Sequence, residues 1–126
     1  MRLTTFRTGT GEPRVGLALA DGAMLDLHYL AVRDPAAKEA WATDMIELIA
    51  GGETALAWLK AQAAATPPAG AVVAAGSYQL LAPIPRPRKN IFCVGLNYRD
   101  HVAEHDNKRK EPRALPTIPV FFSKPP

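Results

Sequence analysis

The sequence predicts an α+β protein in two modules, a small amino-terminal α/β domain followed by the start of a second, β-rich domain. Short apolar segments separated by turn residues fill the first 27 positions, and helical spacing follows in residues 44–65. A proline-rich segment at 83–89 then precedes a new apolar run. We therefore expect one domain over residues 1–82, a connector over 83–89 and the beginning of a second domain over 90–126.

The composition is that of a soluble globular protein. Of 126 residues, 48% are apolar and 21% are charged, and the formal net charge is +3. A disordered chain would have fewer apolar residues and less balanced charge. The basic stretches Arg86–Lys89 and Lys108–Lys110 are short, so we interpret both as solvated loops rather than as a nucleic-acid surface.

The cysteine count and the apolar runs bear on location. Cys93 is the only cysteine, which excludes an intrachain disulfide and favours a cytoplasmic protein. It lies in the apolar run Ile91–Val94, so a buried structural side chain is favoured over a nucleophile. No apolar run reaches spanning length and no apolar leader follows Met1, so we expect neither membrane insertion nor secretion.

The first third is expected to form β-structure. The apolar segments Arg14–Ala20 and Ala23–Leu27 flank Asp21-Gly22. This dipeptide suits a type I′ hairpin turn, in which both central residues take positive φ. Leu3–Arg7 is expected to supply a third strand beside the hairpin.

The middle of the first domain is expected to be helical. Asp44 precedes an apolar run with Glu47 three residues on, which is typical of a helix N-cap. Gly51-Gly52 should end that helix after about two turns. A second helix is predicted from Glu53 to about Ala65, with Trp58 in the core.

The segments after the helices lead into the second module. Thr66–Gly70 should end the last helix, and Tyr78–Ala82 is expected to be a strand leading into a stiff connector with prolines at alternate positions. Asn90–Gly95 and Pro119–Lys124 are each expected to form a buried strand. Because buried strands need neighbours on both sides, we expect the second module to be incomplete.

The side chains best suited to catalysis lie between these two strands. His101 and Glu104 stand three apart, so a helix would put both on one face. Histidine titrates near neutrality, and a nearby carboxylate can share its proton transfer or orient the ring, so the pair could activate a water for attack on a carbonyl carbon. Taken alone, however, a histidine and a glutamate at this spacing are more often an exposed surface pair.

The same segment also matches a metal-binding pattern. His101-Val102-Ala103-Glu104-His105 is an H-x-x-E-H string like that of the inverzincin metalloproteases, in which two histidines one turn apart bind zinc. A zinc protease needs a third protein ligand, and the preceding strand and glycine turn differ from that framework, which disfavours this alternative.

The wider string resembles the fumarylacetoacetate hydrolase family. Members read as an apolar strand, G-x-N-Y-x-x-H-x-x-E, a variable loop and P-x-x-F-x-K-P, and Gly95–Glu104 and Pro119–Pro125 match these patterns. The Arg2–Arg7 start, the predicted hairpin and the Leu81–Pro85 lead-in agree too. The resemblance therefore covers nearly all of the chain.

The resemblance implies a fold and a site. The family's carboxy-terminal domain is a mixed β-roll that holds Mg²⁺ or Mn²⁺ through acidic residues, and an oxo-acid substrate chelates the ion. By matching position, His101 and Glu104 would be the catalytic, water-activating dyad on a short lid helix. Asn97 and Tyr98 would shape the substrate-binding wall, and Lys124 would lie at the edge of the site.

The function expected first is a metal-dependent hydrolase that cleaves a carbon–carbon bond in β-diketo or oxo acids of the fumarylacetoacetate or acylpyruvate type. A family decarboxylase or isomerase, of the oxaloacetate decarboxylase or hydroxymuconate and hydroxyheptadienedioate isomerase type, is the second expectation. A non-catalytic assembly domain is the third. The expected partners are a small oxo acid and a second copy in a homodimer, with no nucleic acid and no membrane.

No metal ligand is assigned. The family's common bacterial form has an E-x-E pair and an Asp beyond P-x-x-F-x-K-P, and this sequence ends at Pro126. Asp26, Asp100 and Asp106 are poor substitutes. We therefore expect the first strands and lid helix of a catalytic roll, truncated and inactive alone, with residues 90–126 exposed, mobile or paired with another copy.

Overall fold

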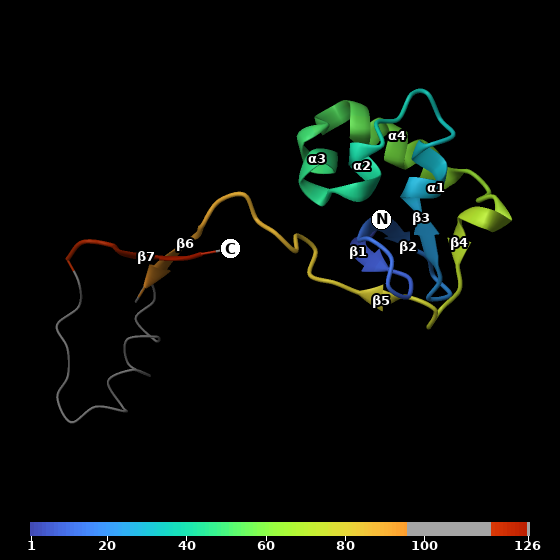
Figure 1. Ribbon diagram of the computed structural model, residues 1–126. Coiled ribbons are helices and arrows are strands. Elements are labelled where there is room, and N and C mark those ends of the chain that lie inside the picture. Colours follow the sequence, from blue (N-terminus) through green and yellow to red (C-terminus); the bar gives the residue numbers. More distant parts are fainter. Residues whose placement is uncertain (96–116, 126) are drawn as a thin grey trace. The chain divides into compact units, whose positions relative to one another are not determined.

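The computed structural model describes residues 1–95 and 117–125. The chain forms two compact units, Met1–Pro85 and Arg86–Pro126. The division between them falls inside the proline-rich segment that was expected to be a connector. The architecture is mixed α+β, as the sequence predicted (Figure 1).

Unit 1, Met1–Pro85, is built on a five-stranded antiparallel sheet with the order β4-β3-β2-β1-β5. The first strand lies between the hairpin and the last strand of the unit, so the sheet joins both ends of the unit. Its strands are β1 (Leu3–Arg7), β2 (Arg14–Ala18), β3 (Met24–Asp26), β4 (Val72–Val73) and β5 (Gln79–Leu80).

The hairpin between β2 and β3 is confirmed, but the predicted type I′ turn is wrong. The Leu19 N–H donates to the Ala23 carbonyl at 2.9 Å, which leaves the three residues Ala20–Gly22 as the loop. The Gly22 N–H donates to the Leu19 carbonyl at 3.3 Å, and Gly22 itself has φ 82°. A type I′ turn has two loop residues, whereas a three-residue loop puts its glycine last, in the left-handed conformation.

Four helices pack with the sheet, and a 3₁₀ turn follows them. The predicted helices are confirmed as α3 and α4. The Asp44 carboxylate accepts from the Ile46 N–H at 2.7 Å at the start of α3, and α4 begins at Gly52, the second residue of the predicted break. The elements are α1 (Leu27–Ala31), α2 (Ala40–Thr43), α3 (Met45–Ala50), α4 (Gly52–Ala64) and η1 (Ala69–Ala71).

Helices α1 and α2 and strand β4 were not predicted. Leu27 was assigned to the end of a strand, but it begins α1. The Asp26 side chain causes the change, because it accepts hydrogen bonds from the His28 and Tyr29 N–H groups and so caps the helix. Within the described residues, none of the helices has the length and apolar character that crossing a membrane requires.

The main core lies between the helices and one face of the sheet (Figure 1). Trp58 belongs to it, as predicted, and its indole N–H donates to the Asp34 carboxylate at 2.8 Å. The other sheet face buries Phe6 and Met24 over Gly16. The main core comprises Val15, Leu17, Leu25, Leu27, Ala31, Trp41, Ala42, Met45, Leu48, Ala55, Trp58, Leu59 and Ala71.

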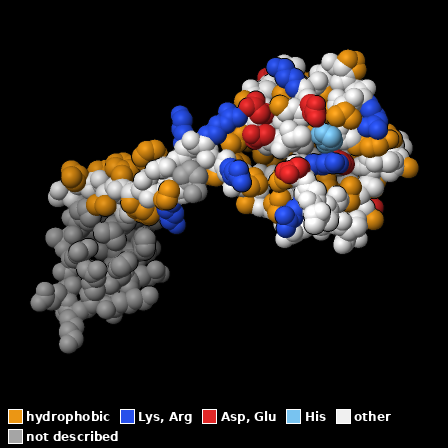
Figure 2. All heavy atoms as spheres, viewed as in Figure 1, with side chains coloured by type: hydrophobic (Ala, Val, Ile, Leu, Met, Phe, Trp, Pro, Cys, Tyr) orange, Lys and Arg blue, Asp and Glu red, His pale blue; other side chains and the backbone are white. Residues whose placement is uncertain are grey.

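In unit 2, Arg86–Pro126, the described strands form an antiparallel ribbon of β6 (Ile91–Gly95) and β7 (Val120–Lys124). Both strands were predicted. They are not buried, which differs from the interpretation of each apolar run as a buried strand but agrees with the expectation that residues 90–126 are exposed in this chain. Phe92 is 79% exposed and Phe121 is 66% exposed, and Cys93 is half-buried. Two strands alone cannot cover either of their faces, so apolar side chains lie along the surface of the ribbon (Figure 2). The β-roll expected here stays a prediction.

Candidate active site

Four of the five predicted site residues, Asn97, Tyr98, His101 and Glu104, lie outside the described residues, as does the predicted lid helix. The ribbon shows where their segment is attached. Gly95, the last residue of β6, lies opposite Val120, the first residue of β7. The connection that carries His101 and Glu104 therefore leaves and re-enters the ribbon at the same end.

Lys124 is the fifth predicted site residue, and the structure describes it. It is exposed, ends β7 and lies opposite Ile91, at the other end of the ribbon from Gly95 and Val120. At about 3.3 Å per residue, the Cα atoms of Val120 and Lys124 are roughly 13 Å apart.

The ribbon face that holds Lys124 is defined by the pairing. Side chains two residues apart in a strand share a face, so Lys124 shares its face with Phe122 and Val120. Cys93 lies opposite Phe122 and belongs to the same face. This face therefore offers a mostly apolar surface that ends in one cation.

The described residues do not fit the Mg²⁺ or Mn²⁺ that the resemblance implies. In residues 1–95 and 117–125, no three His, Cys, Asp or Glu side chains come together as a metal site. Of the acids considered from the sequence, Asp100 and Asp106 lie outside the described residues, and Asp26 is engaged elsewhere.

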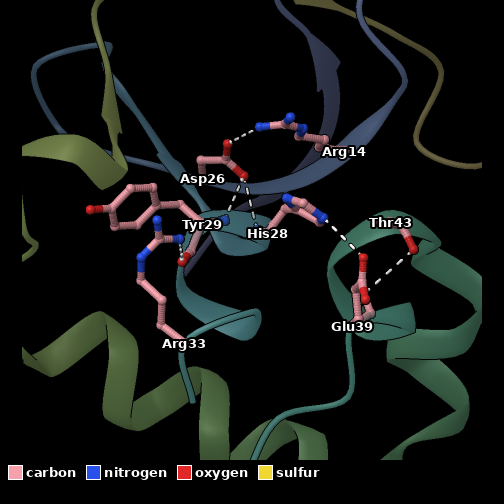
Figure 3. A network of polar contacts seen from close by, with 7 residues as sticks. All are labelled: Arg14, Asp26, His28, Tyr29, Arg33, Glu39 and Thr43. Carbon is pink, nitrogen blue, oxygen red and sulfur yellow. Dashed lines mark hydrogen bonds and ion pairs between the residues drawn. The ribbon is translucent and has the colours of Figure 1, made fainter. Parts of the chain in front are cut away.

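A cluster of polar contacts around Asp26 connects β2, β3 and α1 (Figure 3). One carboxylate oxygen of Asp26 accepts from the Arg14 guanidinium at 2.6 Å. The other accepts from the His28 N–H at 2.9 Å and the Tyr29 N–H at 3.4 Å. One oxygen thus holds α1 at the end of β3 and the other connects β3 to Arg14 of β2, and we interpret Asp26 as a structural residue.

The contacts around Asp26 continue into α2. His28 Nε2 lies 3.2 Å from Glu39 Oε1 (Figure 3), and the Thr43 hydroxyl donates to the Glu39 carbonyl at 3.4 Å. On the other side of α1, the Arg33 guanidinium lies 3.8 Å from the centroid of the Tyr29 ring. The His28–Glu39 contact connects α1 to the start of α2, and the other two contacts are local to one helix, which supports a structural role for all three.

The sequence contained a signal for the Asp26 cap. An aspartate directly before an apolar segment is a usual helix start, and Asp26 precedes Leu27-His28-Tyr29-Leu30. The alternating apolar residues around Asp26 also fit a strand, and α1 has only five residues, too few to show a helical period. Residue spacing therefore could not separate the two possibilities.

No protein-family model matches the chain. Relatives that do match share one activity name. The chain is 35% identical over 126 residues to "Oxaloacetate tautomerase Fahd2a, mitochondrial" of Rattus norvegicus, covering 98% of this chain and 35% of the relative. It is 33% identical over 126 residues to "Oxaloacetate tautomerase fahd2, mitochondrial" of Xenopus laevis, covering 98% and 34%.

A bacterial relative carries the same activity name. "Oxaloacetate tautomerase YisK" of Bacillus subtilis is 46% identical over 48 residues, which are 38% of this chain and 15% of the relative. The chain resembles oxaloacetate tautomerases. In the two vertebrate relatives the similarity covers nearly the whole chain, so it is not confined to one of the two units. The chain spans about a third of the length of these vertebrate relatives.

Proposed function

We propose that the chain belongs to the fumarylacetoacetate hydrolase family and is part of an enzyme that interconverts the keto and enol forms of oxaloacetate or a closely related oxo acid. The observation that carries this proposal is the similarity to oxaloacetate tautomerases over 98% of the chain. The motif G-x-N-Y-x-x-H-x-x-E at Gly95–Glu104 supports membership of this family and indicates which residues would act on the substrate.

The proposed reaction needs one proton to leave carbon and one to reach oxygen. A base takes a proton from the carbon between the oxo group and the distal carboxylate. The electrons of that C–H bond form the carbon–carbon double bond, and the former oxo oxygen receives a proton. No water, oxidant or second substrate is consumed. A histidine, with an unperturbed pKa of about 6.5, can take and return protons near neutrality.

In this proposal His101 moves the proton, and Glu104 orients the imidazole or shares the proton. Asn97 and Tyr98 form the neighbouring wall. Lys124 would bind a substrate carboxylate at the edge of the site, because an ammonium group pairs well with such a group. Mg²⁺ or Mn²⁺, the homodimer and the cytoplasmic location remain predictions; the vertebrate relatives' names describe those proteins as mitochondrial.

Carbon–carbon bond hydrolysis, expected first from the sequence, becomes the second candidate. The same dyad could deliver water to a carbonyl carbon, and the bond to the neighbouring carbon would break with an enolate as leaving group. The family resemblance favours this reaction, whereas the relatives' names favour the isomerase alternative. Both reactions use proton transfer beside an enolate, so one pair of side chains can serve either.

The test uses a protein of the relatives' length that carries this sequence. The enol form of oxaloacetate is supplied, and the loss of its ultraviolet absorbance is followed above the uncatalysed rate. His101→Ala should lower kcat by roughly 10²- to 10⁴-fold, the usual contribution of a general base. Acylpyruvate cleavage, measured in parallel, tests the hydrolase candidate.

His105→Ala is the matched control, because it removes a second imidazole from the same segment. If His101 and Glu104 are the catalytic pair, this variant should keep near-normal turnover. Equal losses in His101→Ala and His105→Ala, together with bound zinc, would instead support the H-x-x-E-H site. Unchanged turnover in His101→Ala would support a non-catalytic assembly domain.

A further inference from the structure

Thr5 is a buried polar residue on β1, and it binds the last residues of unit 1, Leu81–Pro85. It is 3% exposed. Its hydroxyl donates to the Pro83 carbonyl at 2.6 Å, and its own carbonyl accepts from the Leu81 N–H at 2.9 Å. One residue near the start of the chain therefore binds the chain at two points about 80 residues later.

The Thr5 hydroxyl forms its hydrogen bond just beyond the point where the pairing of β5 with β1 ends. Strand β5 pairs with β1 through Phe6 opposite Leu80 and Arg7 opposite Gln79. Continuing that register would place Pro83 opposite Leu3, but proline has no N–H to donate. The carbonyl of Pro83 accepts from the side chain of Thr5 and not from a strand backbone N–H in the continued register.

The segment Leu81–Pro85 also has an apolar anchor. Ile84 is half-buried and packs against the main core of unit 1. Unit 1 includes residues up to Pro85 and no further. The first part of the predicted connector therefore belongs to the amino-terminal unit and is not a free linker.

We propose that Leu81–Pro85 is a strap, closed by the Thr5 hydroxyl, that can open without unfolding the rest of unit 1. With the strap closed, the chain between Pro85 and Ile91 is residues 86–90, five residues. With the strap open, the chain between Leu80 and Ile91 is residues 81–90, ten residues. At about 3.1 Å per residue for a proline-rich extended chain, opening lengthens the tether from roughly 15 Å to roughly 31 Å.

The strap is tested on the full 126-residue chain by hydrogen exchange. Thr5→Val removes the hydroxyl and keeps the branched shape, and Thr5→Ser keeps a hydroxyl. We expect Thr5→Val to speed exchange of the Leu81 amide about tenfold, while amides of the β2–β3 hairpin stay at wild-type rates. Thr5→Ser should stay near the wild type. Limited proteolysis at the Leu80–Leu81 bond should follow the same order.

Thr4→Val is the matched control. Thr4 is the neighbouring residue of β1, and its hydroxyl contacts Gly16 and Met24 on the other face of the sheet. This variant should leave the Leu81 amide unchanged. The strap is refuted if Thr5→Val exchanges like the wild type, if Thr4→Val has the same effect, or if all unit 1 amides speed up together.

Discussion

Asp26→Ala tests the structural role assigned to the polar cluster of unit 1. The substitution removes the acceptor that caps α1 and the carboxylate that binds Arg14. Loss of an N-cap costs about 0.5–2 kcal/mol. A hydrogen bond to a charged group contributes about 1.5–3 kcal/mol, and we take the lower part of that range because the Arg14 side chain is 41% exposed. The expected loss of unfolding free energy is roughly 2–3 kcal/mol.

The assay is urea and thermal unfolding followed by circular dichroism. For a domain of this size, 1 kcal/mol shifts the melting temperature by about 4–8 °C, so Asp26→Ala should melt about 10–20 °C below the wild type. Asp26→Asn keeps a neutral acceptor for the cap and should lose about half as much. Glu12→Gln removes a carboxylate from an exposed position and should change stability by less than about 0.5 kcal/mol.

Two results would refute this reasoning. If Asp26→Ala unfolds within 0.5 kcal/mol of the wild type, by the same rough threshold, the carboxylate does not hold α1 at the end of β3. If Asp26→Asn is as unstable as Asp26→Ala, the cap contributes nothing and only the charge matters. The first result would also reopen the possibility that Asp26 is free to act elsewhere.

Two further predictions follow from packing. Gly16→Ala should lower stability by about 1–3 kcal/mol in urea unfolding, because its added Cβ would lie 2.6 Å from Met24 Sδ and 2.7 Å from Phe6 Cε1. Gly95→Ala, whose Cβ meets its nearest atoms at 3.7 Å, is the control, and equal stability of the two variants would count against close packing at Gly16. Amides of the β6–β7 ribbon should exchange much faster than those of β1 and β2, since an isolated two-stranded ribbon is marginal; equal protection would mean that the ribbon has found a partner.

Local signals predicted much of unit 1. Asp44 as a cap and Gly51-Gly52 as a break located α3 and α4, because both effects depend on residues next to each other in the sequence. The prediction of the turn type was wrong because the turn type depends on strand register. The register pairs Ala18 with Met24 and leaves an odd number of residues between them. The prediction missed helix α1 because a segment of five residues fits both the helical period of 3.6 residues and the strand period of two.

The second unit shows a different limit. Apolar runs predicted both ribbon strands, but burial depends on which other segments cover them, and the sequence does not show this. For the site, the motif named His101 and Glu104, and the ribbon shows only where their segment begins and ends. Lys124 lies on the predicted strand, but only the pairing of Gly95 with Val120 shows that it is at the other end of the ribbon from the segment that carries the motif.

The most direct test of the proposed function follows the proton itself. Oxaloacetate is incubated in deuterium oxide with a protein of the relatives' length that carries this sequence, and deuterium at the carbon beside the oxo group is measured by NMR. The wild type should speed incorporation above the uncatalysed rate, and His101→Ala should lose nearly all of that acceleration while His105→Ala keeps it. Incorporation at the wild-type rate in His101→Ala would contradict the proposal that this imidazole moves the proton.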